Sequence, residues 1–212
     1  MSSTHSVRAI VLKTYDVGEA DRFCVLFTRE IGRVAAKATG TRRLKSRLGG
    51  VLLPFSSVIV QLKESSIGYI ISGAVRSDQD LSFLTDIAAF ARAQEAVELL
   101  LALTVDEDPF PELFDAAEEF FRSCRHVDSA DHTLSFTFRL LSLLGFLPQG
   151  EEMDAFAELS EEERRFIEAS ASGTLRTPPP GSSVLLRSLC KTLIAQQIHW
   201  PMKVPGFAER LK

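Results

Sequence analysis

The segment DVGEADRFCVLFTREIGRVAAKATGTRRLKSRLGGVLLPF, residues 16–55, decides the fold. It contains two short stretches of strand-forming composition, 22–28 and 32–39. They are joined by REIG at 29–32, a tight hairpin turn in which Gly32 can take a positive φ. A long crossover follows, GTRRLKSRLGGVLLPF at 40–55. The order predicts an antiparallel pair of strands and then a long connection.

Three more stretches around this segment have strand character, namely 6–13, 56–62 and 67–74. The first three of the five predicted strands form a meander, and the crossover separates the third from the fourth. Five strands with one long crossover after the third are typical of a small closed Greek-key barrel. We therefore expect an OB-fold barrel in residues 1–80.

From Leu81 onward the apolar residues recur at helical spacing. Ser160 and Glu163 form a capping box at the start of one helix, and Gly173 ends it. The helix over 131–146 is apolar on several faces, so it is expected at the centre of a bundle. The fold class is therefore α+β, an OB barrel followed by an all-helical domain at 81–212, with helices predicted over 80–103, 111–126, 131–146, 158–173 and 182–200.

The charge is distributed unevenly along the chain. Residues 1–80 hold 12 Lys and Arg against 7 Asp and Glu, a balance of +5, and the remainder holds 12 against 21, a balance of −9. Exposed charges are screened beyond about 10 Å, so each part presents its own field. We expect a basic domain at 1–80 that binds nucleic acid and an acidic domain at 81–212 that binds protein partners.

Composition and motifs exclude several classes. The chain has 212 residues, 45% hydrophobic and 25% charged, with no apolar run of spanning length and no apolar segment of a secretory signal in MSSTHSVR, which predicts a cytoplasmic protein. The scattered histidines and the absence of nucleophile, phosphate-loop and dinucleotide motifs predict no enzyme, no metal and no cofactor. Without a CxxC pair, three thiols are expected to be buried: Cys24, Cys124 and Cys190.

The strongest local signal is basic. No acidic residue occurs from Ile31 to Lys63, whereas six cations gather in the first half of that segment. On an OB barrel, strands two and three and the adjoining loops form the face that holds single-stranded nucleic acid. The alternative is a solvated basic loop. The residues predicted to bind nucleic acid, with the first two on one face of a strand, are Arg33, Lys37, Arg42, Arg43, Lys45 and Arg47.

Aromatic side chains add little to this prediction. Phe23 and Phe27 share one face of a predicted strand, and both are expected in the barrel core rather than on a stacking surface. We therefore expect contacts to the DNA backbone to dominate and sequence preference to be weak.

Residues 16–55 closely resemble the N-terminal OB domain of the RecO family of bacterial recombination mediators. FTFRLLSLLGFLP at 136–148 resembles the central helix of that family, and IHWPMKVPGF at 198–207 resembles its C-terminal signature. The resemblance implies a DNA repair and recombination protein that binds single- and double-stranded DNA and anneals complementary strands. It also implies contact with the C-terminal tail of the single-strand binding protein SSB, and joint action with RecR in loading RecA. Such a protein is expected in the cytoplasm, associated with the nucleoid.

One feature departs from the family pattern. Many relatives carry a four-cysteine zinc module after the central helix, but the matching interval here, PQGEEMDAFAELS at 148–160, has no cysteine and is acidic. We therefore expect no zinc.

Cationic side chains on a helical bundle can receive a short acidic, aromatic peptide such as the SSB tail. The alternative for each of them is an ordinary solvated helix charge. Two other functions stay open, a scaffold whose basic loop binds an acidic protein, and an OB-type RNA-binding protein. The residues predicted to hold the tail are Arg139, Arg187, Lys191 and Lys203.

Overall fold

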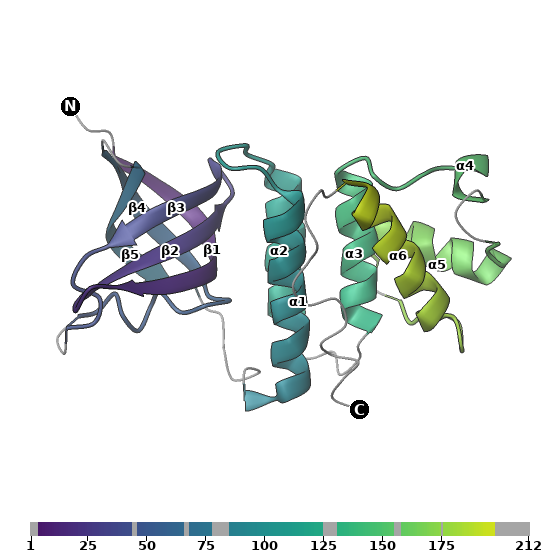
Figure 1. Ribbon diagram of the computed structural model, residues 1–212, viewed down its shortest axis with the longest axis horizontal. Coiled ribbons are helices and arrows are strands. Elements are labelled where there is room, and N and C mark those ends of the chain that lie inside the picture. Colours follow the sequence, from purple (N-terminus) through teal and green to yellow (C-terminus); the bar gives the residue numbers. More distant parts are fainter. Residues whose placement is uncertain are drawn as a thin grey trace. The chain divides into compact units, whose positions relative to one another are not determined.

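The computed structural model describes residues 4–43, 46–65, 68–77, 85–124, 131–154, 158–174 and 176–197. Within these residues five strands precede six helices (Figure 1). The chain forms two compact units, Met1–Ser82 with Thr104–Glu118, and Phe83–Leu103 with Glu119–Lys212. Whether residues 1–80 act as a separate DNA-binding domain stays a prediction.

The strands close into a barrel in the order β1-β2-β3-β5-β4. β3 pairs with β5 in parallel, and the other neighbours are antiparallel. This is the connectivity expected of an OB fold, so the predicted fold class is confirmed. The strands are β1 (Thr4–Val17), β2 (Asp21–Thr28), β3 (Gly32–Ala38), β4 (Ser57–Ser65) and β5 (Gly68–Arg76).

The barrel interior is filled by small and branched side chains, which include Cys24 and Leu26 of β2. Because successive residues of a strand point to opposite faces, Phe23 and Phe27 lie on the outside. Phe27 is 1% exposed and packs on Phe114, with ring centroids 5.9 Å apart, whereas Phe23 is partly exposed. The prediction that both phenylalanines belong to the barrel core was wrong, since Cys24 and Leu26 take the inward positions.

Residues Thr104–Glu118, which include the start of α2 (Pro111–Ser123), pack with the barrel. Arg29 donates two hydrogen bonds to the Asp115 carboxylate, at 2.9 and 3.0 Å. The Arg8 side chain also donates a hydrogen bond to the Glu118 carboxylate. A pair of parallel Arg–carboxylate bonds fixes orientation, so these contacts set the register of the segment against β1 and β2.

α3 (Asp131–Leu143) is the centre of the second unit, as predicted, because it contacts α1 (Ile87–Leu103), α5 (Glu161–Ala171) and α6 (Ser183–Gln197). Its side chains Phe138, Leu140 and Leu141 are fully buried. A four-residue helix, α4 (Glu151–Asp154), lies in the acidic interval where no helix was predicted.

The predicted capping box begins α5. The hydroxyl of Ser160 accepts a hydrogen bond from the Glu163 backbone N–H at 3.3 Å, and the Glu163 carboxylate accepts one from the Ser160 N–H at 2.8 Å. Gly173, with φ 92°, follows the end of the helix as expected. Such reciprocal bonds satisfy backbone donors that the first turn of a helix leaves unpaired.

Among the described residues of the second unit, one histidine is buried. His132 is 3% exposed, stacks on Phe120 with ring centroids 4.4 Å apart, and has its Nε2 2.9 Å from the Ser123 hydroxyl. Burial, together with the charge of Arg92, lowers the pKa of His132 to about 4. The ring is therefore neutral in the folded protein near pH 7.

Acid is expected to weaken this unit through His132. The unfolded chain binds a proton at His132 near the ordinary pKa of 6.5, while the folded protein resists it down to about 4. The contribution of neutral His132 to the free energy of unfolding is therefore fully present above pH 6.5 and is lost as the pH falls from 6.5 towards 4. The loss is about 2 kcal/mol at pH 5. Urea unfolding at pH 7 and pH 5 should show this loss, and His132→Gln should remove the His132 contribution.

Candidate nucleic-acid interface

One end of the barrel joins the turn after β1, the end of β3 and the start of the crossover. Asp21 links them, because its carboxylate accepts a hydrogen bond from the Gly40 N–H at 2.9 Å and lies 2.9 Å from the Lys37 Nζ. The hydrogen bond from the Lys37 side chain is the main cause that lowers the pKa of Asp21, and the hydrogen bond from the Gly40 backbone is the second. Lys37 is thus held at the surface beside the crossover.

Arg42 fastens the crossover to the β1–β2 turn. Its Nε lies 3.5 Å from the Asp16 carboxylate, and its Nη1 donates to the Gly18 carbonyl at 3.1 Å. Asp16 also accepts a hydrogen bond from the Arg22 Nε at 3.1 Å. The Arg42 side chain remains 41% exposed, so it both holds the turn and faces solvent.

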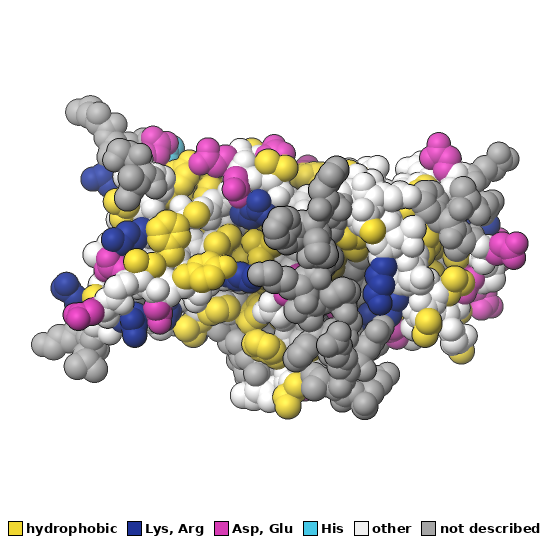
Figure 2. Space-filling model, in the orientation of Figure 1, with side chains coloured by type: hydrophobic (Ala, Val, Ile, Leu, Met, Phe, Trp, Pro, Cys, Tyr) yellow, Lys and Arg dark blue, Asp and Glu magenta, His cyan; other side chains and the backbone are white. Residues whose placement is uncertain are grey.

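Arg43 and Arg47 are exposed. Neither has an ion-pair partner among residues 4–43 and 46–65 or elsewhere in the described part of the chain. Their charges are therefore available to an added anion. Lys and Arg side chains lie among Asp and Glu side chains on the barrel surface in Figure 2. Lys45 lies outside the described residues.

Arg33 occupies a different place. As predicted, it points outward like Lys37, because Val34, Ala36 and Ala38 fill the interior. It lies at the opposite end of β3, however, where it forms an ion pair with Asp106 and its side chain is only 18% exposed. The structure brings Lys37, Arg42 and Arg43 together and leaves Arg33 among residues 104–118.

An outward row that the sequence reasoning did not identify crosses β1, β2 and β3. Tyr15 lies opposite Phe23, and Phe23 lies opposite Lys37. Directly opposed residues of antiparallel strands share a face, so the three side chains are neighbours. The sequence could have indicated this row, because a buried Cys24 points into the barrel. Its neighbour Phe23 then points outward, on the same side as Lys37.

The cations predicted to bind a peptide lie in different surroundings. Arg139 donates a hydrogen bond to the Ala171 carbonyl at the end of α5, which gives it a structural role. Arg187 and Lys191 lie one turn apart on α6, and Lys191 is exposed. Lys203 lies outside the described residues.

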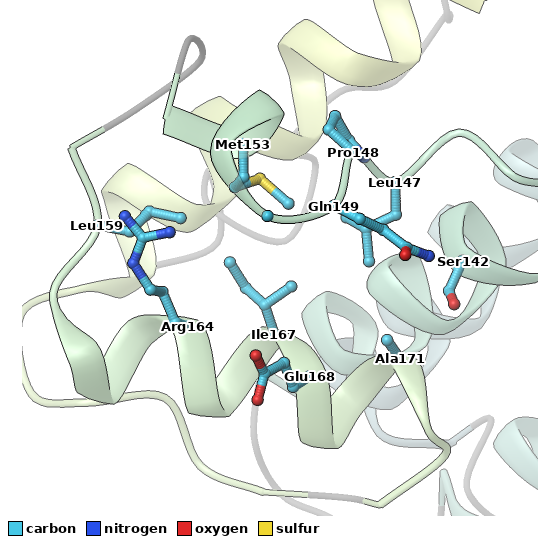
Figure 3. Close-up of a pocket in the computed structure, with 11 residues that line it drawn as sticks. Ser142, Leu147, Pro148, Gln149, Met153, Leu159, Arg164, Ile167, Glu168 and Ala171 are labelled. Carbon is cyan, nitrogen blue, oxygen red and sulfur yellow. The ribbon is translucent and has the colours of Figure 1, made fainter.

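A cavity of about 390 Å³ lies beside α5 in the same unit. Leu147, Met153 and Ile167 surround it, with Arg164 and Glu168 of α5 at its edge (Figure 3). The lining mixes apolar side chains with polar ones, among which Ser142 and Gln149 are neutral, Arg164 is cationic and Glu168 is anionic. Arg139, Arg187 and Lys191, the described cations predicted to bind a peptide, do not line it.

The described residues offer no reactive constellation. Burial raises the pKa of the Cys24 thiol to about 11 and that of Cys124 to about 12, and it also raises the pKa of Cys190. All three thiols are buried, as predicted. In this part of the chain no three His, Cys, Asp or Glu side chains are grouped to hold a metal, and no helix is long and apolar enough to cross a bilayer.

By its fold, the protein is an OB-barrel protein with an added helical unit and exposed arginines at one end of the barrel. Family comparison then assigns residues 1–79 to the family described as recombination protein O N terminal, and residues 84–166 to recombination protein O C terminal. The chain therefore belongs to the RecO family of DNA repair proteins.

Individual relatives agree with this assignment. The chain is 34% identical to the DNA repair protein RecO of Syntrophobacter fumaroxidans over 146 residues, 68% of this chain and 58% of the relative. It is 33% identical to that of Myxococcus xanthus over 169 residues, 76% of this chain and 67% of the relative. A third, from Gloeothece citriformis, is 30% identical over 155 residues, 70% of this chain and 54% of the relative. The match thus spans between about half and two thirds of these relatives.

Proposed function

We propose that this protein is a non-catalytic mediator of DNA repair and recombination that binds single- and double-stranded DNA and anneals complementary strands. The observation that carries the proposal is the exposure of Arg42 and Arg43 beside Lys37 at one end of an OB barrel, with Arg47 also exposed further along the same crossover. Cations so placed can follow a phosphate backbone. Phosphate contacts carry no sequence information directly, so binding has little sequence preference.

Annealing follows from the same charges. Two complementary strands repel each other through their phosphates, and cations that neutralise part of this charge let the strands approach. The bases then pair without any covalent step. The barrel needs only to hold one strand loosely enough for its partner to compete.

The helical unit is the proposed site for proteins. Acting with RecR, the protein helps RecA load onto DNA coated by SSB, and it holds the acidic SSB tail through cations such as Arg187 and Lys191. Their spacing on α6 puts both on one helix face, where they can meet a peptide carboxylate. Anisotropy of a labelled tail peptide tests this contact, with Lys191→Ala expected to weaken it and the exposed Arg165→Ala as control.

Strand annealing tests the central proposal. Two complementary oligomers, one with a fluorescent dye and the other with a quencher, should pair faster with the protein than alone, and the acceleration should fade as salt rises. No acceleration at low salt, despite a folded protein, contradicts the annealing function. Equal acceleration with matched RNA strands favours a general nucleic-acid role instead.

Replacing Asp21 by asparagine is expected to raise DNA affinity by about threefold, because the change frees Lys37 from a partly exposed ion pair and removes a negative charge beside the DNA path. Asparagine retains an oxygen that can accept the Gly40 N–H, so the fold should persist. Anisotropy with a labelled oligomer measures the effect. Glu158→Gln, an exposed acid of the helical unit, is the control that should leave affinity unchanged.

A further inference from the structure

The outer face of β1–β3 presents aromatic rings where solvent would ordinarily favour polar side chains. Tyr15 is 54% exposed and Phe23, directly opposite it, is partly exposed. Phe27, two residues further along β2, is covered by Phe114, whereas no ring contact covers Tyr15 or Phe23 within the described residues. Tyr15 is thus exposed, and Phe23 partly exposed, at the end of the barrel where Arg42 and Arg43 lie.

Cations flank these rings. Lys37 lies on β3 directly opposite Phe23 of β2, and Lys13 lies two residues before Tyr15 on β1, opposite Val25. Cys24 and Leu26 fill the interior, so Val25 and Lys13 share the outward face. The face therefore combines two rings with a cation on each side, the combination that holds single-stranded nucleic acid by stacking and by backbone contact.

The backbone that carries the rings is held in place. Both stand on strands of a closed barrel, and the turn between the strands is fastened by Arg22 and Arg42, which both contact the Asp16 carboxylate. A backbone that is already ordered loses little conformational entropy when a base stacks on the rings. Duplex DNA offers no free base face, because its bases stack on one another within the helix.

We propose that Tyr15 and Phe23 form a stacking platform for unpaired bases, with Lys13 and Lys37 on the backbone, so that this face favours single-stranded over double-stranded DNA. The inference rests on the proposed DNA binding by the barrel. It adds a preference that contacts to phosphates alone do not provide, since a duplex carries phosphates as well.

A thymidine oligomer and an abasic oligomer of equal length, which carry the same charge, separate stacking from backbone contact. The wild-type protein should bind the thymidine oligomer about tenfold more tightly than the abasic one. Tyr15→Leu should lose about fivefold on thymidine and nothing on the abasic oligomer or on a duplex. Tyr15→Phe, which keeps the ring, should behave as the wild type.

Equal affinity of the wild-type protein for thymidine and abasic oligomers would overturn the inference while leaving DNA binding intact. So would a loss in Tyr15→Leu that is the same for both oligomers and for the duplex. If the wild-type protein binds none of the three at low salt, the proposed function fails, and the platform fails with it.

Discussion

Replacing Arg43 and Arg47 together by glutamate is expected to weaken binding to single-stranded DNA about 100-fold at low salt. Both side chains are exposed at the crossover, and neither holds another residue of the described chain through an ion pair. Their reversal removes two phosphate contacts and adds repulsion. It should also make the dependence of log affinity on log salt shallower by about 1.4, since each contact to a single strand contributes about 0.7.

A matched control separates position from net charge. Arg165 and Arg176 are also exposed, but they belong to the helical unit. Their double replacement by glutamate changes the net charge by the same amount. This variant should bind DNA nearly as tightly as the wild type. A similar loss in both double variants would show that overall charge, rather than this end of the barrel, governs affinity.

Replacing Gly32 by alanine is expected to lower the free energy of unfolding by about 3 kcal/mol. Gly32 has φ 87°, which an alanine adopts only with strain. A Cβ there would also lie 2.4 Å from the Asp108 carbonyl oxygen, so residues near Asp108 would have to move away from β3. Backbone strain combined with such a clash belongs to the most damaging kinds of substitution.

Gly18→Ala isolates the contribution of the backbone conformation. Gly18 also has a positive φ, 59°, but no atom lies within 4 Å of the position that a Cβ would take. Its loss should be about 1 kcal/mol. Chemical denaturation of both variants measures the difference, and equal losses would contradict the close packing of the segment near Asp108 against the barrel.

Alternation and turn chemistry were enough to predict the five strands, the hairpin at Gly32 and the capping box at Ser160. They could not decide which face of β2 is inside. Phe23 and Phe27 share one face and Cys24 and Leu26 the other, and both faces are apolar. The barrel interior accepts the smaller pair, while Phe27 finds cover in Phe114, which is distant in the sequence.

The candidate site was predicted in part. The basic crossover is visible in the sequence as a run of positive charge. Arg43 and Arg47 could be predicted from this run alone, because their role depends on no contact with a distant residue. The pairing of Arg33 with Asp106 could not be predicted, because 73 positions separate them. The role of Arg42 in fastening the turn is likewise tertiary, since it depends on where Asp16 and Gly18 lie after folding.

The measurement that tests the central claim most directly is fluorescence anisotropy of the full chain with a labelled single-stranded oligomer over a series of salt concentrations. If Lys37, Arg42, Arg43 and Arg47 all contact phosphates, log affinity should fall linearly with log salt, with a slope of about −2.8. Binding that does not respond to salt, or no binding at low salt, would contradict the claim that this end of the barrel holds DNA.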